Sequence, residues 1–334
     1  MTVPSRLPIV QAPMAGGPST PELAAAVTDA GGFGFVAAGY LSVDALRSAL
    51  DRTRSLTAAP TGVNLFVPGV PATDPAAIAA YADRLRPLAA RLGVEPGEPR
   101  WEDDAYPAKL ALLESAGVHT VSFTFGCPAG DDVRRLQRAG IRVAVTVTNP
   151  AEADAAAAAG ADALIVQGTE AGGHQGTFDG LVPNRTPLLA ALAAIKPTGR
   201  PMIATGGIMT AADAQAALDA GAAAVQIGTA LLCTPEAATS APHRAALLER
   251  RYSGTVITRA FSGRWARGLA NAFALEHADA PAGYPEIHHL TRPLRAAATK
   301  AGDPDGPNLW AGTGWPAVTS APAAEIVRSV AGGL

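Results

Sequence analysis

Two stretches in the second half of the chain decide the fold: MIATGGI at residues 202–208 and AVQIGT at residues 224–229. Each starts as a short apolar run and ends in a glycine turn. Such nearly continuous apolar runs are typical of strands that are buried on both faces of a parallel sheet. Between the two stretches, Thr210 precedes a run of good helix formers, as an N-cap does. The pair therefore predicts a strand–helix–strand unit of an α/β protein.

The same unit recurs along the whole chain. Eight apolar runs are expected as strands, at residues 9–14, 33–37, 62–66, 120–125, 142–148, 163–167, 202–205 and 224–228. Helices are expected between them, at residues 20–30, 43–53, 109–116, 131–139, 150–159, 187–195 and 211–220. Many of these end in Ala-Gly, where glycine supplies the left-handed residue that closes a helix. Eight strands joined by crossover helices predict a (β/α)8 TIM barrel.

A doubly wound open sheet is the alternative, but its Gly-x-Gly-x-x-Gly turn after an early strand is missing from the sequence. Two segments break the eightfold repeat, residues 70–108 and residues 235–302. Long insertions after barrel strands usually cover the catalytic end of the barrel. We therefore expect residues 1–69, 109–234 and 303–334 to form the barrel, and the two insertions to form a smaller, mostly helical lid domain.

Composition excludes several classes of protein. The 334 residues are 48% hydrophobic, which supplies a large core, and the net charge of -3 without a basic cluster argues against a nucleic-acid partner. No apolar run reaches the length of a membrane span, and the first residues lack a secretory signal pattern. Two cysteines do not make a disulfide framework, and His288-His289 lacks a third metal ligand at suitable spacing. We expect a cytoplasmic enzyme, a monomer or homodimer without a metal.

Glycine turns follow the last two predicted strands. Gly206 and Gly207 follow the seventh strand, and Gly228 and Thr229 follow the eighth, after Gln226 and Ile227. Glycine lets backbone N–H groups approach a phosphate closely, and these two loops are the usual phosphate site of the barrel. Ordinary tight turns are the alternative. Two such turns on consecutive strands favour a phosphate-bearing ligand, to which the Thr229 hydroxyl would add a donor.

The loop after the sixth strand carries the candidate catalytic residue. Gln167 ends the strand, and His174 follows Gly172 and Gly173. An imidazole changes its protonation near neutral pH, so His174 can act as an acid, a base or an anion partner. The alternative is a flexible loop with a surface histidine. The Gln167 amide is expected to reach the edge of a bound ring.

The ends of the first and third strands complete the candidate site. Ala12, Pro13 and Met14 are small or soft apolar residues that would lie against a flat ring; a packed strand end is the alternative. Asn64 is polar within an apolar run, and its buried amide needs a hydrogen-bond partner. A bound ligand or a network inside the core would supply one. Cys127, after the fourth strand, is either a pocket thiol or an inert buried one.

Taken in order, these motifs resemble those of the nitronate monooxygenases, also called 2-nitropropane dioxygenases. The motifs are QAPMAGG at residues 11–17, NLF at 64–66, QGTEAGGH at 167–174, ATGGI at 204–208 and QIGT at 226–229. Residues 262–271, 290–295 and 309–312 resemble the bacterial class I branch. The resemblance covers essentially the whole chain, although Thr313 stands where that branch leads us to expect Gln.

The resemblance implies FMN as cofactor and alkyl nitronates, notably propionate 3-nitronate, as substrates that O2 oxidises. The reaction would pass through a flavin semiquinone and give a carbonyl compound with nitrite or nitrate. It also implies FMN contacts from Asn64, Gln167, Gly172, Gly207 and residues 226–229, with His174 as the catalytic residue. A carboxylate on the substrate would need a further cation or hydroxyl, for which Tyr284 is the candidate.

Two other functions remain open from the sequence. One is an FMN-dependent NAD(P)H reductase of quinones or enoyl thioesters on the same scaffold, because such enzymes share the Gly-Gly-His loop. The other is a flavin-binding protein without turnover, against which the His174 loop argues because binding alone does not require that imidazole. Reduction of the flavin by nicotinamides or by nitronates separates the three functions.

Overall fold

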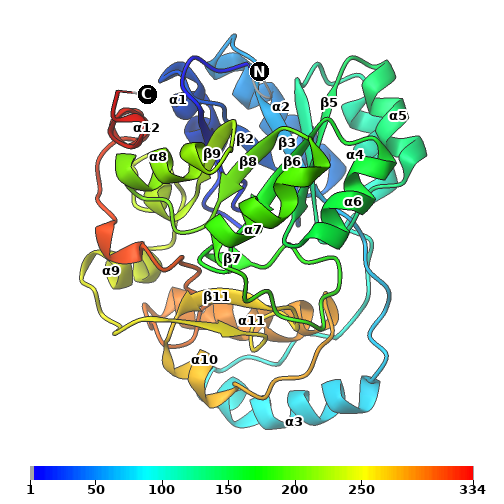
Figure 1. Ribbon diagram of the computed structural model, residues 1–334. Coiled ribbons are helices and arrows are strands. Elements are labelled where there is room, and N and C mark those ends of the chain that lie inside the picture. Colours follow the sequence, from blue (N-terminus) through cyan, green and yellow to red (C-terminus); the bar gives the residue numbers. More distant parts are fainter. Residues whose placement is uncertain (1–3, 334) are drawn as a thin grey trace.

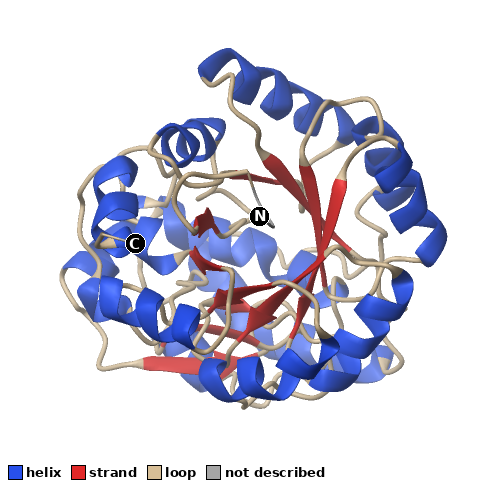
Figure 2. Cartoon of the chain, turned by 45° about the horizontal axis from the view of Figure 1, so that its top comes forward, coloured by secondary structure: helices blue, strands red, loops and turns tan. Residues whose placement is uncertain are grey.

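The computed structural model describes residues 4–333, and a barrel of eight parallel strands forms its centre. The order of the strands in the sheet is β1-β9-β8-β6-β5-β4-β3-β2. They are β1 (Ile9–Gln11), β2 (Phe35–Ala37), β3 (Gly62–Phe66), β4 (Thr120–Thr124), β5 (Arg142–Val147), β6 (Ala163–Gln167), β8 (Met202–Thr205) and β9 (Ala224–Ile227). Parallel hydrogen bonds between β1 and Phe33, just before β2, close the circle. Figure 2 shows these strands ringed by helices, which confirms the predicted TIM barrel.

Every predicted strand is present, and β3, β6 and β8 have the predicted bounds. The main difference is at β1, which ends at Gln11 rather than at Met14. Pro13 explains the early end, because proline has no N–H to donate to a neighbouring strand. The residues from Ala12 onward are thereby released from the sheet into a loop at the barrel mouth.

Eight helices cover the outside of the barrel. They are α1 (Pro21–Asp29), α2 (Val43–Leu56), α4 (Tyr106–Leu113), α5 (Gly130–Arg138), α6 (Pro150–Ala159), α7 (Leu188–Ile195), α8 (Ala211–Asp219) and α12 (Ala323–Ala331). Thr210, the expected N-cap of α8, accepts a backbone N–H of the first helical turn, and Thr20 and Asn149 do the same at α1 and α6. The sequence did not predict α12, which packs against α8 and α1 and completes the ring.

The two insertions share a second apolar core. Helix α3 (Pro75–Leu92) from the first insertion packs against α11 (Glu286–Lys300) from the second. The buried side chains of this core come from both segments: Ile78, Tyr81, Leu85, Ala89, Ala260, Phe261, Phe273, Ala274, Ala280, Ile287, Leu290 and Leu294. Figure 1 shows α3, α10 (Ala272–Glu276) and α11 gathered at one end of the barrel. We refer to residues 70–108 and 235–302 together as the lid.

The lid is mostly helical, as expected, but it also contains a small sheet that the sequence did not predict. Strands β10 (Thr255–Thr258) and β11 (Ala266–Leu269) are antiparallel, and β11 pairs with β7 (Gly173–His174). Strand β7 belongs to the loop after β6, so the barrel contributes one strand to the sheet of the lid (Figure 1). The remaining elements are α9 (Ala241–Leu248) and three short 3-10 turns, η1 (Lys196–Thr198), η2 (Thr229–Leu231) and η3 (Trp315–Ala317). Among residues 4–333, no helix is long and apolar enough to cross a membrane.

Candidate active site

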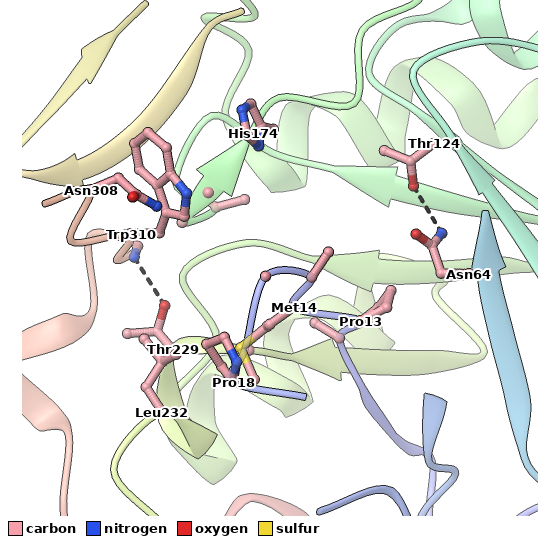
Figure 3. Close-up of a pocket in the computed structure, with 18 of the residues that line it drawn as sticks. Pro13, Met14, Pro18, Asn64, Thr124, His174, Thr229, Leu232, Asn308 and Trp310 are labelled. Atoms are coloured by element: carbon pink, nitrogen blue, oxygen red, sulfur yellow. Dashed lines mark hydrogen bonds between the residues drawn. The ribbon is translucent and has the colours of Figure 1, made fainter. Parts of the chain in front are cut away.

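A cavity of about 480 Å³ lies between the carboxyl ends of the barrel strands and the lid. Strand ends supply polar side chains to it, among them Asn64, Thr124, Gln167 and Gln226. The lid and the chain that follows it supply Phe261, Ser262, His288, Arg295, Asn308 and Trp310. Figure 3 shows His174 and Trp310 along one side of this cavity, away from Pro13 and Met14.

The structure brings nearly all of the predicted site residues to this one cavity. Those that line it are Ala12, Pro13, Met14, Asn64, Gln167, Gly172, Gly173, His174, Gly206, Gly207, Gln226, Gly228 and Thr229. Ile227 does not, which corrects the prediction for that residue. Because side chains alternate along a strand, Ile227 points away from its neighbour Gln226 and is buried in the core between the strands and helices.

The glycine turns after β8 and β9 form a cradle of backbone donors. Gly206 and Gly207 have positive φ angles of 122° and 74°. A Cβ on Gly207 would lie 2.9 Å from the Cβ of Glu170, so a side chain there would collide with the loop after β6. Within residues 4–333, the N–H groups of Gly206, Gly207, Gly228 and Thr229 donate to no acceptor. Unpaired N–H groups around small residues suit a bound phosphate.

Thr229 takes part in this cradle through its hydroxyl group. Its Oγ1 accepts the Gly312 N–H at 2.9 Å, which is one of the dashed contacts in Figure 3. A threonine hydroxyl can accept and donate at the same time, so its hydrogen stays available for a phosphate oxygen. The same contact holds the chain around Gly312 against the turn.

Two amide side chains lie at the strand ends on the floor of the cavity. The Oε1 of Gln226 is buried and has no hydrogen-bond partner among the described residues. The Nδ2 of Asn64 donates to Ser122 Oγ and to Thr124 Oγ1, both at 3.0 Å, so a core network partners one end of this amide. Buried polar groups are normally paired, and an unpaired amide oxygen in a cavity indicates a missing donor. A flat heterocycle with N–H and C=O groups along one edge would provide it.

Side-chain hydrogen bonds hold the loop that follows β1 in place. Ser19 Oγ accepts the Met14 N–H at 2.8 Å and the Gln11 amide at 3.0 Å. The Oε1 of Gln11 in turn accepts the Phe35 N–H at 3.2 Å, across the point where the barrel closes. The position of Met14 is thereby tied to the first two strands of the barrel.

The side-chain amide of Gln167 forms hydrogen bonds with the loop that carries His174. Its Nε2 donates to the His174 carbonyl at 3.2 Å, and its Oε1 accepts the Gly176 N–H at 2.7 Å. Both ends of the amide are therefore engaged with this loop, although the side chain also lines the cavity. The sequence predicted the place of Gln167 but not this role.

His174 lies on β7 among aromatic side chains. Its ring centroid is 5.4 Å from that of Trp310, 5.6 Å from that of Phe125 and 5.8 Å from that of Tyr284. The Nε2 atom is 2.8 Å from Ser262 Oγ in the lid. The Nδ1 atom has no partner among residues 4–333, which leaves it for a ligand.

The charge of this site comes from arginine and not from histidine. Burial, followed by the nearby charges of Arg264 and Arg295, lowers the pKa of His174 to about 3, so the imidazole is neutral at physiological pH. Burial also lowers the pKa of each arginine to about 10, which leaves both guanidinium groups charged. Arg264 is only 7% exposed and lies 4.3 Å from the centroid of the Phe125 ring.

Tyr284 does not line the cavity directly. Its hydroxyl donates to the Tyr40 hydroxyl at 3.1 Å, and the Tyr40 ring stacks on His288 with centroids 4.3 Å apart. Tyr40 does line the cavity, and burial raises the pKa of its hydroxyl to about 12, so this group is neutral. Because Tyr40 accepts the hydrogen of Tyr284, its own hydrogen remains available to a ligand.

Several of these residues were missed by the sequence reasoning. Tyr40 follows β2, and an aromatic residue at the mouth end of a strand is a signal that could have located it. Arg264, Arg295 and Asn308 lie in or after the lid, where no strand pattern marks the active end of the barrel. Cys127, left open above, is half-buried and lies outside the residues that line the cavity.

Comparison with known proteins settles the family. The model of the family described as "Nitronate monooxygenase" matches residues 4–332. The chain belongs to the nitronate monooxygenase family. It is 42% identical to a nitronate monooxygenase of Pseudomonas aeruginosa, over 97% of this chain and 95% of that protein. It is 40% identical to a nitronate monooxygenase of Paraburkholderia phytofirmans, over 97% of this chain and 91% of the relative.

Solved structures agree with this membership. Nitroalkane oxidase from Streptomyces ansochromogenes superposes with a TM-score of 0.96 at 48% identity, covering 99% of this chain and 96% of that one. FabK from Thermotoga maritima superposes with a TM-score of 0.77 at 25% identity, covering 98% and 93%. The nitronate monooxygenase family consists of flavin-dependent oxidoreductases, so the resemblance found in the sequence is confirmed and the protein is an oxidoreductase.

Proposed function

We propose that the protein is an FMN-dependent nitronate monooxygenase that oxidises small alkyl nitronates, such as propionate 3-nitronate, with O2. The products would be a carbonyl compound and nitrite or nitrate. One observation carries the proposal: a neutral His174 and the charged Arg295 line one cavity that ends at a cradle of glycine N–H groups, and the buried, charged Arg264 is close enough to His174 to lower its pKa. Uncompensated positive charge favours a negatively charged substrate, and a nitronate is an anion.

The residues of the cavity fit FMN. The phosphate would be held by Gly206, Gly207, Gly228 and Thr229, because their backbone N–H groups are unpaired and can donate to its oxygens. The strand-end amides and the glycines of the β7 loop would meet the ring system, with Ala12, Pro13 and Met14 along its face. Bound FMN would accept electrons from the substrate and deliver them to O2.

His174 would orient the substrate rather than remove a proton from it. A nitronate has already lost its α-proton, so no base is needed to start its oxidation. The Nδ1 of His174 faces the ligand while Ser262 holds Nε2, which fixes the plane of the ring. With a neutral nitroalkane, the same uncharged imidazole is in the right protonation state to accept the α-proton.

The lid would keep water from the reacting groups. Trp310, Phe125 and Tyr284 surround His174, and the lid core packs behind them. An apolar enclosure strengthens each charge–charge and hydrogen-bond contact with an anion inside it. We propose that Tyr284 acts on the substrate through Tyr40, whose hydroxyl it orients.

Anaerobic mixing tests this proposal. FMN-loaded protein is mixed with propionate 3-nitronate, ethyl nitronate, NADH and NADPH in separate experiments, and the flavin absorbance is followed. We expect a rapid change with the nitronates, and nitrite or nitrate with a carbonyl product once O2 is admitted. Bleaching by NADH or NADPH with no response to either nitronate would instead identify a reductase. A flavin that responds to none of the four would indicate a binding protein without turnover.

A further inference from the structure

We propose that Arg295 and Asn308 together bind a carboxylate on the substrate, at the end remote from the nitronate group. The proposal rests on the proposed function and narrows its substrate class to nitronates of short carboxylic acids. It replaces Tyr284, the residue that the sequence suggested for this task. Both residues line the cavity.

Arg295 is a fixed cation without an anion. Its Nε donates to Thr291 Oγ1 at 3.0 Å, its Nη2 to the His288 carbonyl at 3.0 Å, and its Nη1 to Asn308 Oδ1 at 2.8 Å. These acceptors are neutral, and no Asp or Glu among residues 4–333 forms an ion pair with the guanidinium. Burial of an uncompensated charge is costly, and an anionic ligand in the cavity would relieve that cost.

The neighbouring histidine does not add to this charge, and its tautomer follows from the arginine. Arg295 Nη2 lies 3.3 Å from His288 Nδ1, and arginine can only donate, so Nδ1 is the unprotonated nitrogen. Burial, followed by the charge of Arg295, lowers the pKa of His288 to about 2. His288 therefore remains neutral, and the positive charge on this side of the cavity belongs to Arg295 and to the more exposed Arg292.

Asn308 supplies the second donor. Its Oδ1 accepts from Arg295, which fixes the orientation of the amide because the arginine has no acceptor to offer. The Nδ2 of Asn308 has no acceptor among the described residues, and one N–H of Arg295 Nη1 is also unused. The two free donors lie on either side of one hydrogen bond, a spacing that suits the two oxygens of one carboxylate. Figure 3 shows Asn308 beside Trp310, on the same side of the cavity as His174.

The position of Arg295 also fits the other end of the substrate. Trp310, two residues after Asn308, has its ring centroid 5.4 Å from that of His174, and both arginine and imidazole line the same cavity. The charge of Arg295 also contributes to the lowered pKa of that imidazole. A short acid nitronate can therefore place its nitronate beside His174 while its carboxylate reaches Arg295 and Asn308. A nitronate without a carboxylate would leave both donors unused.

Asn308→Asp is the sharpest test, because it keeps the size of the side chain and its contact with Arg295. The new carboxylate pairs with the guanidinium, removes the Nδ2 donor and repels a second carboxylate. Arg295→Gln removes the charge directly. The control is Lys300→Gln, which removes one positive charge from the exposed end of the same helix.

Two measurements are made on FMN-loaded protein. Calorimetric titration gives the Kd of propionate, an unreactive carboxylate, and steady-state kinetics compare propionate 3-nitronate with ethyl nitronate. We expect Asn308→Asp and Arg295→Gln to weaken propionate binding and to lower kcat/KM for the acid nitronate by about 30-fold or more, mainly through KM. Ethyl nitronate, which the same charge attracts only through its nitronate group, should lose clearly less, so the ratio of the two kcat/KM values should fall in both variants. Lys300→Gln should resemble the wild type.

An equal loss for both nitronates, or an unchanged Kd for propionate, would overturn the carboxylate site. Failure of the proposed function has a different signature, in which the wild type oxidises neither nitronate. The propionate titration then still decides the role of Arg295 and Asn308, because it requires no turnover.

Discussion

His174 is neutral because the fold buries it next to two arginines rather than next to a carboxylate. A histidine paired with a carboxylate would carry a proton and a positive charge. The negative charge of the carboxylate would cancel it, so the pair would not attract an anion. Here the positive charge resides on Arg264 and Arg295, and the imidazole is left to make directed hydrogen bonds. The division of tasks separates attraction of the anion from orientation of the reacting group.

Replacement of His174 by alanine should leave FMN bound and remove most turnover. The phosphate cradle does not involve this side chain, whereas loss of a positioned imidazole typically lowers rates by about 100-fold or more. The flavin absorbance of the purified variant and its kcat with a nitronate are the measurements. Turnover equal to that of the wild type would show that the assigned role of His174 is wrong.

The activity on nitronates should not depend on ionisation of His174 between pH 5 and 8. Because its pKa is lowered to about 3, the imidazole is already neutral throughout this range and does not titrate. A profile of kcat/KM against pH, recorded with a preformed nitronate, checks this. A step near pH 6.5 that disappears in His174→Ala would contradict it, since 6.5 is the ordinary histidine pKa.

Gly207→Ala should weaken FMN binding by about 10-fold or more. The residue has a φ of 74°, and the added Cβ would lie 2.9 Å from the Glu170 Cβ, so the cradle must distort. Gly199→Ala is the matched control, because Gly199 has a similar φ of 68° but nothing within 4 Å of the added atom. Dissociation constants from flavin fluorescence should rise for Gly207→Ala alone. An equal rise in both variants would point to general backbone strain instead.

At the scale of elements, the closure between β1 and β2 joins the fold to the site. Strand β1 has only three residues and therefore forms few backbone hydrogen bonds with β2. The Gln11 side chain adds one across this junction by accepting the Phe35 N–H. The other end of that amide donates to Ser19, which holds the backbone of Met14. One side chain therefore serves both the closure of the barrel and the loop at its mouth.

Gln11→Met should destabilise the protein by about 1–3 kcal/mol. The apolar side chain fills the same space, but the buried Phe35 N–H and the Ser19 hydroxyl lose a partner. Urea unfolding of the variant should show a lower midpoint with an unchanged slope. FMN binding should weaken as well, because the Met14 loop loses its clamp. Wild-type stability in this variant would mean that another group pairs with the Phe35 N–H.

The barrel elements were predictable because each strand is a buried apolar run that ends at a polar or glycine residue. The same rule located the phosphate turns and His174, since both follow directly from strand ends. It failed for β7, β10 and β11, which are short, and the pairing of β7 with β11 spans more than 80 residues of sequence. It also failed for Arg264, Arg295 and Asn308. Only the packing of the lid on the barrel brings Arg295 and Asn308 to the cavity and Arg264 close to His174.

For the whole molecule, several buried histidines make stability depend on acidity. Burial lowers the pKa of His174 to about 3, of His243 to about 4 and of His288 to about 2. The unfolded chain binds protons at these sites near pH 6.5, while the folded protein does not. The stability that these sites contribute is therefore present above about pH 6.5. It is lost progressively as the pH falls from there to the folded-state values between 4 and 2, by about 2 kcal/mol for each histidine at pH 5.

Thermal unfolding at a series of pH values measures this loss. The Tm should be constant between pH 7 and 8 and should fall steeply below 6.5. His243→Asn should reduce the steepness, because it removes one buried site that takes up a proton on unfolding. A Tm that rises on acidification would require carboxylates with raised pKa values to outweigh the histidines.

The pairing of β11 with β7 limits where the lid of one protein can be exchanged for the lid of a relative. A lid transplanted at the ends of its two insertions would arrive as a two-stranded ribbon, which is marginal in water. The barrel left behind would present the strand of His174 with one edge unpaired. Workable recombination points therefore lie before Gly172 and after Gly176, so that His174 travels with the lid.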